Sequence, residues 1–184
     1  MAEAAAEATR RAHAPRVLVS AASRHGATTE IAQAIGQVLS GQGLSVAVIA
    51  PGDVRSLDGY DAVIIGSAVY MGHWLDPAQE LVNRFRVALA DRPVWLFSSG
   101  PVGKPSSKLA QAMDQDPADL SAMVEATHAR DHRRFAGKLD RKVLSLHQRA
   151  GLLVFRGLDG DFRDWVGIRQ WADGIARQLA LAPR

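Results

Sequence analysis

The sequence predicts a doubly wound α/β fold in which five parallel strands carry helices on both faces. Apolar, β-branched runs alternate with segments of helical periodicity along most of the 184 residues. Two of the runs, 17–22 and 62–66, are apolar on consecutive positions, as expected for parallel strands that helices cover on both sides. There is neither an internal repeat nor a shift in composition, so we expect one domain over residues 16–184.

The strands are predicted from short apolar runs between turn residues, and the helices from apolar residues at every third or fourth position. Residues 1–15 precede the first run; they are polar and alanine-rich, so we expect a frayed or disordered tail. In chain order, the expected strands are 16–22, 44–50, 61–70, 93–99 and 132–140. The expected helices are 29–43, 77–90, 105–129 and 164–180.

The helices also carry start and stop signals. Gly41 and Gly43 end the first helix, and Pro77 opens the second, which breaks at Asp91. The helical segment 105–129 contains an internal proline. The last helix has an apolar face formed by Trp165, Ile168, Trp171, Ile175 and Leu179.

Composition excludes several classes of protein. The chain has no cysteine, which excludes disulfides, thiolate catalysis, iron–sulfur clusters and cysteine zinc sites. It has no apolar run long enough to span a bilayer and no secretory signal, so we expect a cytoplasmic protein. A net charge of +3 does not indicate a nucleic-acid partner.

Positive charge is concentrated between His128 and Arg156, where eight basic residues and two aspartates give +6. Two interpretations remain open: a solvated basic face, or a site that attracts an anionic ligand or a membrane surface.

Ligands of doubly wound sheets bind beyond the carboxyl ends of the strands, where the strand order reverses. This rule selects the loops 23–28, 67–76 and 98–104. The first loop offers the hydroxyls of Ser23 and Thr28, and Gly26 allows close approach to amides at a helix N-terminus, which together suit a phosphate. The alternative is an ordinary strand-to-helix turn with a threonine cap.

The other two loops suit a flat heterocycle. Tyr70, Met71, His73 and Trp74 offer aromatic and polarisable side chains for stacking, although Trp74 is also suited to covering the next helix. The third loop adds hydroxyls and glycines that expose amides to the edge of a ring.

Competing sites fail on their motifs. The third loop is not a triphosphate loop, because Ser98 replaces the first glycine and Pro105 follows Lys104. The acidic strand ends of a receiver domain, the G-x-S-x-G of a hydrolase and the G-x-G-x-x-G of a dinucleotide site are all missing. His128 and His132 have metal-ligand spacing but lack a third ligand, so we interpret them as surface residues.

Five segments resemble the flavodoxin-like FMN-binding family, and within it the branch of menaquinone-dependent protoporphyrinogen oxidases and flavodoxin-domain proteins. They are VLVSAASRHGATTEIAQAI, GSAVYMGHWLDPAQELVNRF, WLFSSGPVG, FAGKLD and GDFRDWVGIRQWADGIA. The resemblance covers residues 16 to about 180 and implies strand order 2-1-3-4-5 with FMN as cofactor. The implied phosphate-binding residues are Ser23, Arg24, His25, Gly26, Ala27 and Thr28. The residues implied to flank the isoalloxazine are Ser67, Ala68, Val69, Tyr70, Met71 and Gly72, with Ser99, Gly100, Pro101, Val102 and Gly103 at its other edge.

The resemblance also implies a function. We expect an FMN-dependent oxidoreductase that passes electrons from an organic donor, such as a porphyrinogen, to a quinone-type acceptor, with His73 as the candidate acid or base. The alternatives are a non-catalytic electron-transfer or interaction module served by a partner reductase, and a NAD(P)H:quinone reductase. The flavin loops have almost no acidic residues, unlike those of the flavodoxins that the chain resembles, which favours two-electron chemistry. Residues 142–156 are apolar with basic ends and suit either a peripheral membrane contact or packing on the sheet, and a homodimer is a further expectation.

Overall fold

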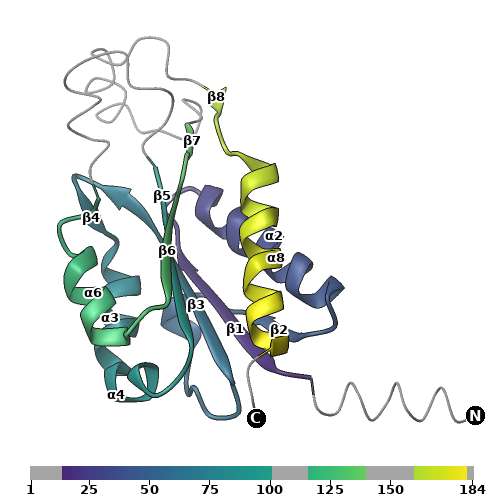
Figure 1. The fold of residues 1–184 in the computed structure, drawn as a ribbon. Coiled ribbons are helices and arrows are strands. Elements are labelled where there is room, and N and C mark those ends of the chain that lie inside the picture. Colours follow the sequence, from purple (N-terminus) through teal and green to yellow (C-terminus); the bar gives the residue numbers. More distant parts are fainter. Residues whose placement is uncertain (1–13, 101–115, 140–159, 182–184) are drawn as a thin grey trace, which may run out of the picture.

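A parallel sheet of five strands forms the centre of the protein in the computed structural model (Figure 1), which describes residues 14–100, 116–139 and 160–181. The strands lie in the spatial order β2-β1-β3-β5-β6. In chain order of the parallel strands this is 2-1-3-4-5, which confirms the predicted fold and puts the reversal of strand order at β1 and β3. The strands are β1 (Arg16–Ala22), β2 (Ser45–Val48), β3 (Ala62–Tyr70), β5 (Val94–Ser99) and β6 (Asp131–Phe135).

Helices cover both faces of this sheet (Figure 1). One face packs against α2 (Ala27–Gly41) and α8 (Trp165–Leu181). The other face packs against α3 (Asp76–Arg84), α4 (Arg86–Ala90) and α6 (Leu120–Thr127), with the short 3-10 helix η1 (Pro51–Asp53) beside them.

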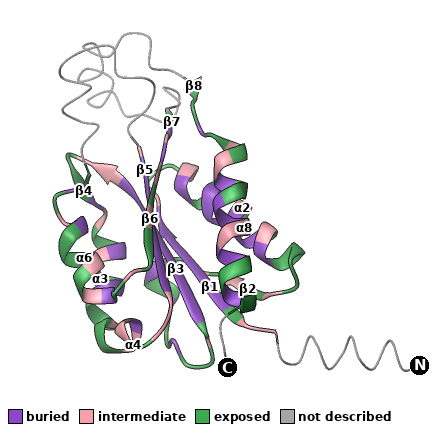
Figure 2. Cartoon of the chain, in the orientation of Figure 1, coloured by how far each residue is buried: buried purple, intermediate pink, exposed green. Residues whose placement is uncertain are grey.

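Burial on both faces explains the apolar runs of the strands. Val17, Leu18 and Val19 of β1 are all fully buried, because Val17 and Val19 contact the core under α2 and α8 while Leu18 contacts the opposite core. Figure 2 shows the same pattern, with buried strands between helices whose outer surfaces are exposed. The apolar face predicted for the last helix is confirmed at four of its five positions, and Trp165 is half-buried.

Three local features differ from the predicted elements. The helix expected over 77–90 is divided at Phe85 into α3 and α4. The strand expected over 132–140 ends at Phe135, and β7 (Lys138–Leu139) pairs antiparallel with β8 (Gly160–Asp161) in a separate small sheet. Next to this small sheet, the Gly137 carbonyl accepts a hydrogen bond from the Phe162 amide. A short β4 (His73–Trp74), which was not predicted, pairs antiparallel with β3.

Several predictions concern residues outside the described ones. These are most of the amino-terminal tail, part of the helix expected over 105–129, the site residues Pro101, Val102 and Gly103, and the segment 142–156. Among the residues that the structure does describe, no helix has both the length and the apolar character needed to cross a membrane.

Candidate functional site

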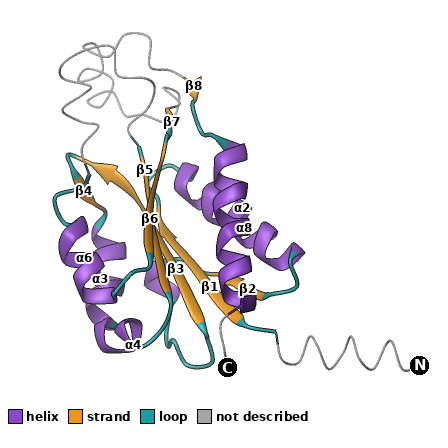
Figure 3. Cartoon of the chain, in the orientation of Figure 1, coloured by secondary structure: helices purple, strands orange, loops and turns teal. Residues whose placement is uncertain are grey.

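The strands that precede the three predicted loops end side by side, at the edge of the sheet formed by the carboxyl ends of the strands (Figure 3). We call this the three-loop edge. Ala22 at the end of β1 pairs with Ser67 of β3, and Ala68 pairs with Ser99 at the end of β5. Because these strands are parallel, the segments that follow β1 and β5 leave the sheet at the same level. The structure therefore brings together the regions that the sequence selected separately.

The loop 23–28 is built to present backbone amides. Gly26 has a φ of 85° and precedes α2, so a glycine without a side chain occupies the capping position. The Thr28 amide donates to Ser23 Oγ at 3.2 Å, and the Glu30 amide donates to the Gly26 carbonyl at 2.9 Å. The alternative of a threonine cap is wrong, because Thr28 lies inside the helix and is 1% exposed. Amides at a helix N-terminus beside hydroxyls form a donor set that fits a phosphate.

A tight hairpin forms the second loop. Tyr70 pairs with His73, and the two residues between them, Met71 and Gly72, have φ values of 53° and 81°. Two successive positive φ values are typical of a type I′ turn, and Met71 adopts this conformation at an energetic cost because it carries a side chain. The Met71 side chain is 94% exposed. A strained, exposed apolar residue at the sheet edge fits contact with a flat apolar ligand.

Arg24 connects the first two loops. Its guanidinium carbon lies over the Tyr70 ring, 4.5 Å from the centroid, which is cation–π geometry. Burial raises the pKa of the Tyr70 hydroxyl, and the positive charge of Arg24 opposes this increase. Tyr70 is therefore a neutral aromatic surface, and a positive charge lies at the junction of the two loops.

Trp74 does not belong to the exposed surface of the second loop. It is 2% exposed and packs in the core beneath α3 and α6, which confirms the interpretation that it covers the next helix. Its Nε1 donates to Ser98 Oγ at 2.8 Å, and its backbone amide donates to the Asp119 carboxylate. The Leu75 amide donates to Ser67 Oγ at 2.9 Å. These bonds hold the hairpin against β3, β5 and α6.

His132, which we interpreted as a surface residue, is half-buried, so that interpretation is wrong. Its Nε2 lies 2.9 Å from Ser98 Oγ, the same oxygen that accepts from Trp74. Because the indole only donates, the Ser98 hydroxyl can donate its own proton to neutral His132 at Nε2. Burial lowers the pKa of His132, partly offset by Asp116 and Asp131, which favours this neutral form.

His73 lies on the exposed side of the hairpin, with its side chain 59% exposed and Nδ1 3.7 Å from Asp119 Oδ1. The Asp119 carboxylate is the group that would orient the imidazole. The role of His73 as an acid or base stays a prediction. In the third loop, Ser99 is buried, and Gly100, with a φ of 115°, donates its amide to the Phe135 carbonyl.

Sequence reasoning missed Arg163, which lies beside the first loop. Its side chain is 2% exposed and forms ion pairs with Asp161 and Glu30, and Nη1 donates to the Ala27 carbonyl at 3.2 Å. The hydrogen bonds from Arg163 lower the pKa of Asp161, so both groups remain charged. An arginine between two aspartates in GDFRDW indicates a local ion pair, but nothing near it in the sequence indicates its contact with Ala27, which is 136 residues away.

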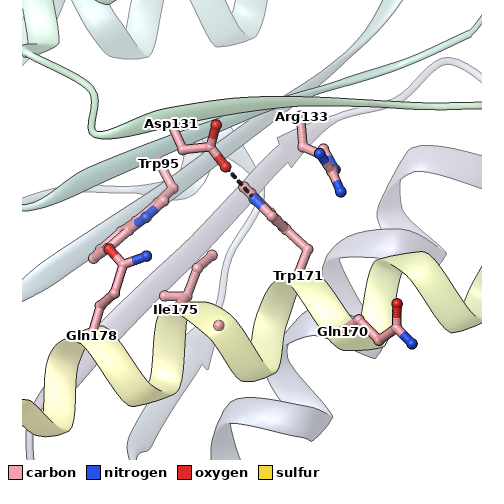
Figure 4. Close-up of a pocket in the computed structure, with 8 residues that line it drawn as sticks. Trp95, Asp131, Arg133, Gln170, Trp171, Ile175 and Gln178 are labelled. Carbon is pink, nitrogen blue, oxygen red and sulfur yellow. Dashed lines mark hydrogen bonds between the residues drawn. The ribbon is translucent and has the colours of Figure 1, made fainter.

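A hollow of about 260 Å³ lies away from this edge, between α8 and the first residues of β5 and β6 (Figure 4). Trp171 donates to Asp131 across it at 2.7 Å. Trp95 Nε1, although buried there, has no hydrogen-bond partner within the described part of the chain. The hollow lies at the amino ends of these strands and therefore does not belong to the three-loop edge.

Comparison with known proteins agrees with the observed fold. The family model described as "Flavodoxin domain" matches residues 18–160, which is more than half of the chain. A flavodoxin from the domain Archaea superposes with a TM-score of 0.61 at 18% sequence identity, covering 90% of this chain and 99% of the other. A mutant flavodoxin from Pseudomonas aeruginosa gives 0.57 at 14% identity, with the same coverage.

Larger proteins contain the same fold as a part. The flavodiiron core from Synechocystis sp. PCC6803 superposes with a TM-score of 0.61 at 15% identity. The match covers 96% of this chain but only 38% of that protein. No curated protein sequence matches the chain. Identities this low show the fold alone.

Proposed function

The chain belongs to the flavodoxin-domain family, and from this premise we propose that it binds FMN non-covalently at the three-loop edge and acts as an FMN-dependent oxidoreductase. The observation that carries the proposal is the alignment of an amide-presenting loop at 23–28 with an aromatic hairpin at 70–73 on one sheet edge. One loop suits the phosphate and the other suits the ring, as a flavin mononucleotide requires.

Each loop has a distinct task in this proposal. Ser23, Thr28 and the first amides of α2 hold the phosphate, so no lysine is needed there. Tyr70 and the strained Met71–Gly72 turn flank one side of the ring, and Ser99 with Gly100 lines the other. When bound, FMN supplies the redox chemistry, and the protein supplies orientation, electrostatics and exclusion of water.

The charge around the proposed ring site favours two-electron chemistry. Neither 23–28 nor 67–72 contains an acidic residue, and Arg24 places a positive charge above Tyr70. Positive charge stabilises an anionic reduced ring. His73, whose Nδ1 lies 3.7 Å from Asp119 Oδ1, is on the exposed side of the hairpin and is the candidate acid or base for an organic substrate.

The finer proposal is a protoporphyrinogen-oxidase-like activity with a quinone-type acceptor. It is supported by the resemblance of the GSAVYMGHWLD and GDFRDW segments to that branch and by the near-absence of acidic residues from the flavin loops. A membrane contact through 142–156 and a homodimer belong to the same proposal. The second candidate is an electron-transfer module, which the nearly full-length match to small flavodoxins favours.

Cofactor binding is tested first. We expect the fluorescence of FMN to be quenched when FMN binds to the apoprotein in a titration. FMN should bind more tightly than riboflavin, because riboflavin lacks the phosphate. Thr28→Val, at the buried position in the first turn of α2, is expected to weaken FMN binding, whereas Thr29→Val at the exposed neighbouring position is the matched control. Equal affinity for the two flavins would contradict the phosphate site.

Turnover then separates the two functions. The FMN-loaded protein is mixed with a quinone and a porphyrinogen in the absence of any reductase. Catalytic oxidation of the porphyrinogen supports the enzyme, whereas reduction of the protein only by an added partner reductase supports the carrier. Flotation with anionic vesicles tests the membrane contact.

A further inference from the structure

A buried arginine lies next to the loop proposed to bind the FMN phosphate, and this inference rests on that proposed function. Arg163 precedes α8, and its side chain is 2% exposed. An arginine is seldom buried unless each part of its guanidinium has a partner. Its partners therefore show what the residue is positioned to do.

Each nitrogen of the Arg163 guanidinium donates at least one hydrogen bond. Nε and Nη2 donate to the two carboxylate oxygens of Asp161, at 2.7 and 2.6 Å, in a bidentate pair. Nη1 donates to Glu30 Oε2 at 2.7 Å and to the Ala27 carbonyl at 3.2 Å. The planar group also stacks on Trp165, with its carbon 4.3 Å from the ring centroid. Rotation of the guanidinium would break several of these contacts at once.

The bond to Ala27 orients one particular peptide group. The carbonyl of Ala27 and the amide of Thr28 belong to the same planar trans peptide, so they point in opposite directions. The carbonyl faces Arg163, and the amide donates to Ser23 Oγ inside the loop. Holding the carbonyl therefore fixes the direction of the Thr28 amide, which in turn holds Ser23 Oγ within the loop proposed to bind the phosphate.

We propose that Arg163 is a positioning residue for the phosphate-binding loop, which orients the Ala27–Thr28 peptide without itself contacting the phosphate. The ligand class is the terminal phosphate of a flavin mononucleotide. Arg163 thus couples the small β7–β8 sheet, through Asp161, to the first turn of α2.

A role in joining α2 to α8 alone does not account for this arrangement. The two helices already share an apolar core that includes Ile31 and Ile35 of α2 and Ile168 and Ile175 of α8. The ion pairs of Arg163 with Glu30 and Asp161, whose side chains are 47% and 39% exposed, contribute little net stability compared with apolar packing, since solvent screens them and desolvation of Arg163 opposes the attraction. The bond to the Ala27 carbonyl, in the first turn of α2 where the loop ends, is the contact that a purely structural pair would not need.

The test compares phosphate recognition with flavin recognition. In Arg163→Met, we expect the dissociation constant for FMN to rise about tenfold, as for the loss of one hydrogen bond from a loop donor to the charged phosphate, while that for riboflavin changes less than about twofold. The ³¹P resonance of bound FMN is expected to shift as well. Arg169→Met, on the exposed face of α8, is the matched control and should change neither value.

Arg163→Lys keeps the charge but lacks the planar fork, so it should also lose the preference for FMN over riboflavin. It serves as the second variant if the methionine variant does not fold. Either variant, folded and with an unchanged preference, overturns this inference alone. A wild-type chain that binds both flavins equally overturns the proposed phosphate site and this inference with it.

Discussion

Replacing Gly66 by alanine tests the packing of β3 against β5 next to the candidate site. A Cβ atom built at Gly66 would lie within 2.5 Å of three ring carbons of Phe97. Non-bonded carbon atoms prefer separations of about 3.5–4.0 Å. The ring or the strand would therefore have to move by about 1 Å.

The surroundings of Phe97 leave little room for that movement. The ring is fully buried and packs against Phe135 and Trp171, with centroid separations of 6.0 and 6.2 Å. Overpacking of a dense core costs about 1–3 kcal/mol, and a clash of this size lies at the upper end. We expect Gly66→Ala to lower the free energy of unfolding by about 3 kcal/mol, which corresponds to about 9 °C in Tm for a chain of this length.

Urea and thermal denaturation of the apoprotein measure the effect. Gly174→Ala is the matched control, because no atom lies within 4 Å of its built Cβ and the residue is inside α8. That variant should be more stable than wild type by about 0.8 kcal/mol, from helix propensity. The same chemical change is thus expected to have opposite signs at the two positions.

A double-mutant cycle identifies the cause. Phe97→Leu removes the ring carbons that the new methyl group would meet, so Gly66→Ala should cost less in that background. If Gly66→Ala is as stable as wild type, or if its cost is the same with and without the Phe97 ring, the close packing of β3 and β5 is refuted.

Three further predictions concern the site itself. Burial lowers the pKa of His132 below 6.5, so the unfolded chain takes up a proton first as the pH falls. The free energy of unfolding of the wild type, measured by urea denaturation, should therefore decrease below about pH 6.5. His132→Gln should remove the part of this decrease that comes from His132. Arg24→Gln should lower the two-electron potential of bound FMN by about 20 mV in a dye-equilibration titration, because a surface charge contributes up to about 1 kcal/mol, while Arg55→Gln should leave it unchanged. Gly26→Ala should weaken FMN binding and destabilise the apoprotein by about 1 kcal/mol, because its φ of 85° disfavours a side chain although space is open; Gly26→Asn should be milder, and equal stability of all three proteins would show that the left-handed conformation is not required.

The second loop shows how far a sequence pattern can be followed into a site. Its position was predicted correctly, because it follows a buried parallel strand. The sequence indicated that Trp74 is suited to covering the next helix, but it did not indicate that Met71 would stay exposed beside it. The turn at Met71 and Gly72 reverses the chain, so that Trp74 enters the core while Met71 remains exposed. A strand of two residues is too short for alternation to show which side chain faces inward.

The order of strands and helices, and the loops that meet at one sheet edge, could be read from the chain because they depend on local periodicity and on the shared direction of parallel strands. The ion pair between Arg163 and Glu30 joins residues that are 133 positions apart in the sequence. The hydrogen bond between His132 and Ser98 joins residues that are 34 positions apart. The spacing of polar side chains along the sequence does not indicate which distant residue each of them will contact. Such contacts arise only when the apolar faces have packed and brought α8 beside α2 and β6 beside β5.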